Sequence, residues 1–309
     1  MKKKLSSVVV CLTPFDNDGK LDEPAFRRQL GRLRDAGVCV YMAGSGSGEA
    51  YSLTKDERDR VMTIAVEELK GKVPVRAMGC EPHVIGDMVE FMRAAERAKV
   101  DAAQIFSLDI GHAAKPTFAE LERYYSTVIE STSLKVYISS HQASGYFIPL
   151  DLIEKLVKRY PTIAGVAYAG HDIGYIASLI ARVGDRVEGH SAGPGNALTV
   201  LGLGGNGFMG GEGNFCPGLF TAVISAWEQN DYDRLRVDFG KLIEFTAISS
   251  KYGGGSAMRA MKPLMNAFGM PGGTLRPPRM PVSDADLQEV IKAVLKIDIP
   301  GTPPLVKRA

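Results

Sequence analysis

The chain is poor in the residues that build disulfide, metal and nucleic-acid sites. Its four cysteines stand far apart and form no Cys-x-x-Cys pair, so no disulfide framework or zinc ribbon is expected and the thiols are predicted to be reduced. The five histidines show neither His-x-His nor His-Glu-x-x-His spacing, and we predict no metal site. The net charge is only +2, without a block of basic residues, which argues against nucleic acid as a partner.

Long apolar runs are missing as well. No run approaches the length of a transmembrane helix, and the N-terminal Met1-Lys2-Lys3-Lys4 is not followed by the long apolar region of a signal peptide. We therefore expect a cytoplasmic protein without a membrane partner. The composition is otherwise that of a globular protein, and the near-neutral charge favours a small neutral or anionic substrate.

A turn rich in glycine and serine, residues 44–49, joins an apolar run to the start of a helix. The run at 37–42 is almost continuously apolar, as in a parallel strand that is covered on both faces. After the turn, Thr54 is followed three residues later by Glu57, which is the pattern of a capping box. The turn fits neither the dinucleotide fingerprint nor the nucleotide-binding Gly-Lys-Ser/Thr motif, and we predict no cofactor.

The Gly/Ser turn has the composition of a small anion pocket. Gly46 and Gly48 allow the backbone to take positive φ or to approach a ligand closely. Ser45 and Ser47 offer hydroxyls beside backbone N–H groups near a helix start, where a carboxylate or a phosphate would fit. A plain structural turn is the alternative, so the place of the turn in the fold matters.

Short β-branched runs alternate with helical periods almost from end to end, a pattern that predicts a TIM (β/α)8 barrel. The active site of such a barrel lies at the C-terminal ends of the strands, which is where the Gly/Ser turn falls. The expected strands are residues 7–12, 38–42, 75–78, 102–106, 135–139, 165–168, 187–190 and 207–210. The expected helices between them are residues 23–36, 55–70, 84–98, 118–130, 150–159, 173–183 and 194–203.

The remaining helical periods predict a C-terminal helical extension. We assign residues 1–228 to the barrel and residues 229–309 to the extension. Three consecutive glycines at 253–255 form the one expected flexible hinge. Helices are expected at residues 222–227, 231–249, 257–267 and 284–295.

Several motifs occur in the order and spacing of a known family. Thr13-Pro14-Phe15 with Gly19 follows the first expected strand, and Gly46-Ser47-Gly48-Glu49 follows the second. With these motifs the chain resembles the pyruvate-dependent Schiff-base aldolases and dehydratases typified by dihydrodipicolinate synthase and N-acetylneuraminate lyase. The other matching residues are Gly207, Asn214, Pro217, Lys262, Leu275-Arg276-Pro277-Pro278 and Pro281.

The resemblance implies a class I lyase that acts on a 2-keto acid such as pyruvate. In this family a lysine on the sixth strand condenses with the keto group to form a Schiff base, and the iminium acts as the electron sink. The turn after the second strand holds the carboxylate, which assigns substrate binding to Gly46, Ser47 and Gly48, together with Gly210 at the end of the eighth strand. Glu49 is expected to anchor the turn, and a homotetramer is implied.

The sixth strand departs from the family pattern. Where the family has Gly-Ile/Val-Lys, this chain has Gly165-Val166-Ala167, so Ala167 stands at the Schiff-base lysine position. An alanine cannot form an imine. Neither Lys135 nor Lys262 is expected to replace the amine, since the first opens the fifth strand at its opposite end and the second belongs to a C-terminal helix.

The fifth strand departs as well. The family's proton-relaying tyrosine aligns with Ile138 by direct counting and with Tyr137 if one residue is inserted. We prefer Tyr137, because a phenol is the group needed to shuttle protons beside a keto acid. Ala143 takes the place of the arginine that follows in dihydrodipicolinate synthase, which argues against a substrate with a distal carboxylate such as aspartate semialdehyde.

Four histidines are expected near the C-terminal ends of strands: His112, His141, His171 and His190. Each is either a hydrogen-bonded structural imidazole or an acid–base group of the site. His112 follows the fourth strand, where the family has an aromatic pair, so it could replace a phenol there and reach a neighbouring subunit. His112, His141 and His171 join Tyr137 and Ala167 in the predicted catalytic set.

Two functions follow from these departures. The first is a lyase, either an aldolase or a dehydratase of a 2-keto acid, whose imine-forming lysine has been replaced and which is thereby inactivated. The second is a natural lysine-free homologue, either a lyase that uses His and Tyr as acid and base or a non-catalytic keto-acid-binding protein. The codon of the parent gene at position 167 discriminates between them.

Overall fold

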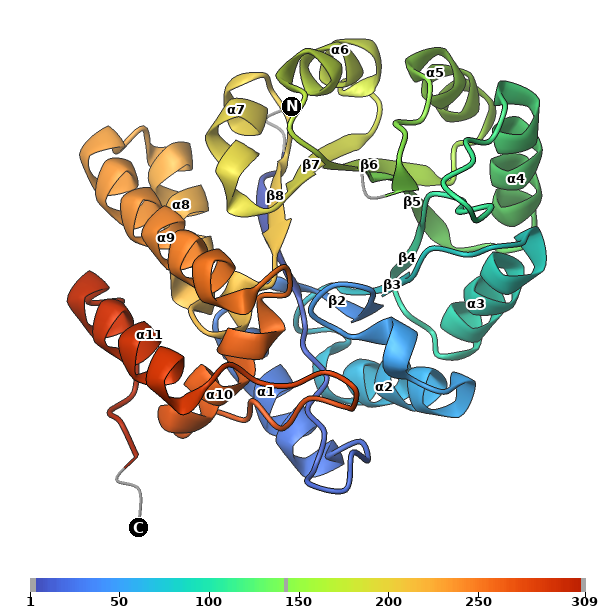
Figure 1. Cartoon of the computed structure of the whole chain (residues 1–309). Coiled ribbons are helices and arrows are strands. Elements are labelled where there is room, and N and C mark those ends of the chain that lie inside the picture. Colours follow the sequence, from blue (N-terminus) through green and yellow to red (C-terminus); the bar gives the residue numbers. More distant parts are fainter. Residues whose placement is uncertain (1–3, 142–143, 307–309) are drawn as a thin grey trace.

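The computed structural model describes residues 4–141 and 144–306. Its centre is a closed barrel of parallel strands that pair in chain order, with β8 returning to β1 (Figure 1). The TIM barrel predicted from the sequence is thus confirmed. The strands are β1 (Ser6–Val10), β2 (Cys39–Gly44), β3 (Val75–Gly79), β4 (Ala102–Ile105), β5 (Lys135–His141), β6 (Ile163–Ala169), β7 (Glu188–Ala192) and β8 (Gly207–Gly210).

Helices surround the barrel (Figure 1), and most of their buried residues belong to the hydrophobic core. In α5 the buried residues recur at helical spacing: Leu152, Ile153, Leu156 and Val157. The predicted capping box of Thr54 begins α2. The helices of the barrel are α1 (Glu23–Asp35), α2 (Lys55–Leu69), α3 (Ile85–Arg97), α4 (Phe118–Glu130), α5 (Leu150–Arg159), α6 (Ile173–Val183), α7 (Ala197–Gly202) and α8 (Pro217–Gln229), with short turns η1 (Ala50–Ser52), η3 (Pro194–Asn196) and η4 (Glu212–Asn214).

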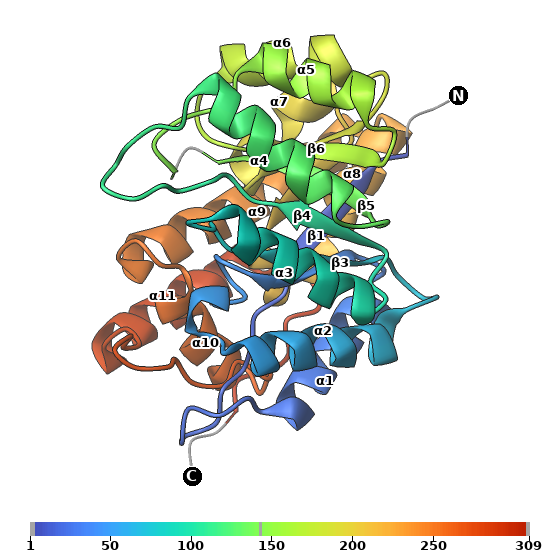
Figure 2. The same cartoon turned by 90° about the vertical axis from the view of Figure 1, so that its right-hand side faces the viewer.

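The C-terminal helices are α9 (Tyr232–Gly253), α10 (Met258–Ala267) and α11 (Asp284–Ile297). Figure 2 shows α10 and α11 on the side of the barrel away from the N-terminus, which is the side where the strands end. The three glycines expected as a hinge instead close α9, because Gly253 is its last residue and Gly254 takes φ 54° as its C-cap. The extension therefore packs beside the C-terminal face of the barrel.

A cluster of polar side chains fills the lower half of the barrel interior, that is, the half nearer the N-terminal ends of the strands. The Arg76 guanidinium lies 4.2 Å from the centre of the Tyr137 ring and donates a hydrogen bond of 3.2 Å to Glu188 Oε2. The Tyr137 hydroxyl donates to the same oxygen at 2.8 Å, and His190 Nε2 is hydrogen-bonded to Ser6 Oγ at 2.9 Å. Charged and aromatic groups, rather than aliphatic layers, thus fill this end of the barrel.

Burial, together with the nearby charge of Arg76, lowers the pKa of His190 from 6.5 to about 4, against the opposing charge of Glu188. Between these two values the unfolded chain binds one proton more than the native chain. Stability contributed by the neutral ring is therefore complete above pH 6.5 and is lost as the pH falls toward 4. A difference of this size corresponds to roughly 3 kcal/mol.

The chain as given should lose free energy of unfolding as the pH falls from 6.5 to 4. We predict that His190→Gln reduces this loss by roughly 3 kcal/mol, because glutamine cannot take up the proton. Urea denaturation of both proteins at pH 7 and pH 4.5 measures the change. Both proteins contain the same carboxylates, so the difference between their pH dependences reports the histidine together with its interaction with Glu188. An unchanged pH dependence in the variant would show that the buried ring does not carry this effect.

Candidate active site

A cavity of about 170 Å³ opens at the C-terminal ends of the strands. Each strand of the barrel, or the turn that follows it, contributes to its wall. The prediction that the Gly/Ser turn lies at this end of the barrel is met. The lining residues are Val10, Ser45, Gly46, Ser47, Met78, Gln104, Phe106, Ser139, His141, Ala167, Ala169, Ala192, Gly193, Met209, Gly210 and Gly211.

The Gly/Ser turn is folded tightly on itself. A Cβ atom on Gly48 would lie 2.6 Å from the backbone nitrogen of Gly44, so only glycine fits at this position. The Gly48 carbonyl accepts a hydrogen bond of 2.8 Å from Thr13 Oγ1. Gly48 is not among the residues that line the cavity. It shapes the turn, while Ser45, Gly46 and Ser47 form the surface that lines the cavity.

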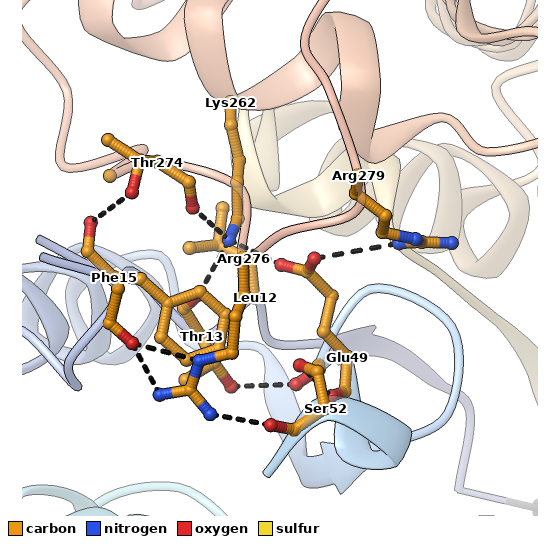
Figure 3. Close-up of polar contacts among 12 residues, drawn as sticks. Leu12, Thr13, Phe15, Glu49, Ser52, Lys262, Thr274, Arg276 and Arg279 are labelled. Atoms are coloured by element: carbon orange, nitrogen blue, oxygen red, sulfur yellow. Dashed lines mark hydrogen bonds and ion pairs between the residues drawn. The ribbon is translucent and has the colours of Figure 1, made fainter. Parts of the chain in front are cut away.

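Glu49 anchors the turn from the side opposite the cavity. It is fully buried and takes a left-handed backbone conformation with φ 52°. Its carboxylate forms an ion pair with Lys262 Nζ of α10, and Arg279 Nη1 lies 3.5 Å from its other oxygen (Figure 3). Burial lowers the pKa of the Lys262 ammonium, whereas the Glu49 carboxylate acts in the opposite direction.

The Lys262 ammonium has further partners that fix its position. It donates hydrogen bonds of 2.8 Å to the carbonyl oxygens of Thr13 and Thr274 (Figure 3). Its side chain is 1% exposed. The amine is therefore saturated by the segments that flank the barrel, and it does not reach the cavity.

A second ion pair ties the extension to the helix after the turn. Arg276 binds the Glu57 carboxylate with two hydrogen bonds of 2.7 and 2.9 Å, and its Nε donates to the Gly19 carbonyl at 2.8 Å. This contact lowers the pKa of Glu57. Since Glu57 also closes the capping box with Thr54, the start of α2 is held from both sides.

The structure places Ala167 in the cavity wall, where it is 2% exposed. On the neighbouring strand it pairs with Ser139, which also lines the cavity. The residue of β5 beside Ala167 is therefore Ser139, which was not among the residues considered from the sequence. Tyr137 faces the interior but two residues lower, where it belongs to the polar cluster and its hydroxyl binds Glu188.

The predicted histidines separate into three positions. His141 lines the cavity, with its ring centre 6.0 Å from that of Phe106. Burial lowers its pKa below the usual 6.5, so the ring is neutral at pH 7. His112 and His171 are exposed on loops and do not line the cavity, and His190 lies below it. His112 and His171 thus follow the C-terminal ends of β4 and β6 as expected, but of the four histidines only His141 lines the cavity.

Sequence reasoning missed Gln104 and Phe106 of the cavity wall. Both lie on or directly after β4 at alternate positions, so their side chains share the inner face. The alternation of side chains along this strand could have placed both residues on its inner face. Gly210, predicted to bind substrate, does line the cavity, and a Cβ atom on it would meet Glu212 Oε2 at 2.5 Å.

The cavity lining carries no lysine, arginine, aspartate or glutamate side chain among the residues that the structure describes. An anion would be bound there by hydroxyls and backbone N–H groups. Within residues 4–141 and 144–306, no group of three or more His, Cys, Asp or Glu side chains is placed to hold a metal ion. No helix in the same ranges is both long and apolar enough to span a bilayer.

The fold and the cavity define a (β/α)8-barrel protein with a small uncharged pocket at the catalytic face. The model of the dihydrodipicolinate synthetase family matches residues 3–297, and the chain belongs to this family. A 4-hydroxy-tetrahydrodipicolinate synthase of Methanosarcina acetivorans is 26% identical over 293 residues, covering 93% of this chain and 96% of the relative.

Two further similarities extend the comparison. A protein of Methylobacterium radiotolerans named as a probable 5-dehydro-4-deoxyglucarate dehydratase is 28% identical over 283 residues, covering 90% of both chains. YagE of E. coli K12, a prophage protein of the dihydrodipicolinic acid synthase family in complex with pyruvate, superposes with a TM-score of 0.88 at 21% identity, covering 96% of this chain and 99% of YagE. The first supports a lyase of the aldolase or dehydratase type, and the second shows the fold.

We predict that Lys262→Met lowers the free energy of unfolding by about 3–5 kcal/mol, because it removes the buried cation nearest to the Glu49 carboxylate and leaves only Arg279 beside it. The double variant Glu49→Gln/Lys262→Met should lose less than the sum of the two single variants. Urea denaturation of the four proteins measures the coupling. The exposed pair of Lys55 and Glu90 provides the control, since Lys55→Met should cost below about 1 kcal/mol. Additive losses at the buried pair would contradict the prediction.

Proposed function

We propose that this chain binds a small 2-keto acid in the cavity, with the carboxylate held by Ser45, Gly46 and Ser47. The observation that carries the proposal is the wall formed by this turn, which offers hydroxyls and backbone N–H groups to an anion at the C-terminal face of the barrel. Pyruvate is the first ligand to test, and its presence in YagE, which has the same fold, supports that choice.

We further propose that Ala167 stands where the lyases of this family carry the imine-forming lysine. Its place in the cavity wall on β6 supports this. A methyl group cannot condense with a keto acid. Lys262 does not substitute for the missing amine, because its ammonium is bound to Glu49 and two backbone carbonyls. On this proposal the chain is a Schiff-base lyase that has lost its nucleophile and is inactive as given.

A second function, that of a natural lysine-free homologue, is favoured by one observation. The neutral His141 imidazole lies in the cavity, where it can accept a proton from a bound substrate. Tyr137 is less suited to that role, because its hydroxyl donates to Glu188 in the polar cluster. Without acid–base chemistry at His141, the same cavity would make a keto-acid-binding protein.

We predict that Ala167→Lys forms a covalent adduct with pyruvate that borohydride traps, whereas the chain as given does not. The barrel around position 167 would desolvate the ammonium and lower its pKa, which leaves free amine at neutral pH. Intact mass after incubation with pyruvate and borohydride measures the adduct. Ala169→Lys is the matched control, since Ala169 lines the same cavity two residues further along β6.

An adduct that depends on lysine at position 167, and is absent or minor with lysine at 169, supports the lysine-dependent lyase. If neither lysine variant is modified while all three proteins bind pyruvate, the Schiff-base proposal is wrong. In that case His141 becomes the group to test, with the pH dependence of turnover as the measurement.

We also infer a cytoplasmic homotetramer, on the basis of the family resemblance. Light scattering after size-exclusion chromatography should then give about four times the mass of one chain, 33.3 kDa. A symmetric assembly of identical chains is the usual form of soluble oligomers. A single species with the mass of one chain across the accessible concentration range would remove the tetramer from the proposal.

A further inference from the structure

We infer that Gln104 determines substrate specificity by hydrogen-bonding a hydroxyl group on the part of the 2-keto acid that lies beyond the carboxylate. The inference rests on the proposed function, because it places a keto acid in the cavity. Gln104 lies on β4, is 2% exposed and lines the cavity. It is the one amide side chain among the lining residues that the structure describes.

The amide of Gln104 is incompletely satisfied by the protein. Its Oε1 atom is fully buried and accepts no hydrogen bond from the described residues. Leaving a buried polar atom without a partner costs about 1–3 kcal/mol, so native structures rarely keep one unless something else supplies the partner. Once the Gln104 amide turns its oxygen toward the cavity, a ligand there can do so. An amide presents an acceptor and two donors, which suits a hydroxyl that both donates and accepts.

The remainder of the cavity wall restricts the charge of the ligand. Apart from His141, the described lining residues have no ionisable side chain. A second carboxylate would need a cation to replace its hydration, and an ammonium group would need an anion. The Ser139 hydroxyl and the Gln104 amide instead suit an uncharged, hydrogen-bonding group. The cavity thus favours a hydroxylated monocarboxylic 2-keto acid over a dicarboxylic or amino-substituted one.

The size of the cavity agrees with a ligand of this class. Its volume of about 170 Å³ is close to that of the ~150 Å³ engineered cavity that accommodates benzene. A molecule of the size of pyruvate with one added hydroxymethyl or hydroxyl group fills such a space. Gln104 and Ser47 both line this volume, so a ligand of that size can contact the amide and the carboxylate-binding turn together.

The test compares hydroxypyruvate with 2-oxobutanoate, which have nearly the same shape and differ by a hydroxyl in place of a methyl group. Titration calorimetry on the chain as given should show about tenfold tighter binding of hydroxypyruvate, as expected for one hydrogen bond in a buried site. Gln104→Met should abolish the preference and change the affinity for 2-oxobutanoate by no more than about twofold. Oxaloacetate, with its second carboxylate, should bind more weakly than either.

Two controls make the outcomes distinct. Gln229→Met changes an exposed glutamine of α8 and should leave the preference intact. Ser47→Ala should weaken binding of all the keto acids, including pyruvate, by a similar factor. The role of Gln104 is wrong if the chain as given binds hydroxypyruvate and 2-oxobutanoate equally, or if the preference survives Gln104→Met. Either result leaves the proposed function standing. Failure of every keto acid to bind overturns the proposed function and this inference with it. If Gln104→Met does not fold, the comparison of the two ligands on the chain as given still tests the predicted preference for the hydroxylated ligand.

Discussion

The ion pair between Glu49 and Lys262 is the contact on which the site depends. Both of its side chains are buried, and it joins the last residue of the Gly/Ser turn to the helix α10, more than two hundred positions later in the chain. Two desolvated charges are tolerated there because the ammonium also binds two backbone carbonyls, so its hydration is replaced by fixed partners. The same contact holds Glu49 in a left-handed conformation that a residue with a side chain adopts reluctantly. The C-terminal extension is therefore part of the wall that positions the turn.

The barrel interior divides into two layers that share the same strands. On β5 the inward side chains are Tyr137, Ser139 and His141, of which the first belongs to the polar cluster and the other two to the cavity. Adjacent residues on one face of a strand are separated by only about 7 Å. A phenol two positions too low is thus directed toward Glu188 and Arg76 and away from a ligand. The polar cluster and the cavity are consequently distinct in chemistry, one ionic and one uncharged.

This division explains which features the sequence could reveal. The barrel follows from the alternation of short β-branched runs with helical periods. The turn at 44–49 was recognisable because its glycines and serines lie between a buried strand and a capped helix. The position of Tyr137 in the polar cluster was not visible in the sequence, because the register of β5 against β6 includes an irregularity between Val136 and Tyr137 that has no local sequence pattern. Gln104 was overlooked because a single glutamine in an apolar strand has no motif. Its meaning depends on the absence of hydrogen-bonding neighbours, which only the packed structure shows.

The electrostatics of the cavity follow from what surrounds Ala167. Val10, Met78, Phe106 and Met209 contribute apolar surface, and serine hydroxyls and backbone groups contribute the polarity. In such surroundings an ammonium group would lose much of its hydration, so its pKa would fall, and the carboxylate of a bound keto acid would be the nearest group able to offset its charge. The apolar wall would thus favour the neutral amine, whereas the carboxylate of a bound keto acid would favour the ammonium form. The uncharged wall that suits a monocarboxylic ligand is also the wall that would keep an amine at position 167 nucleophilic, so selectivity and reactivity would have the same physical origin.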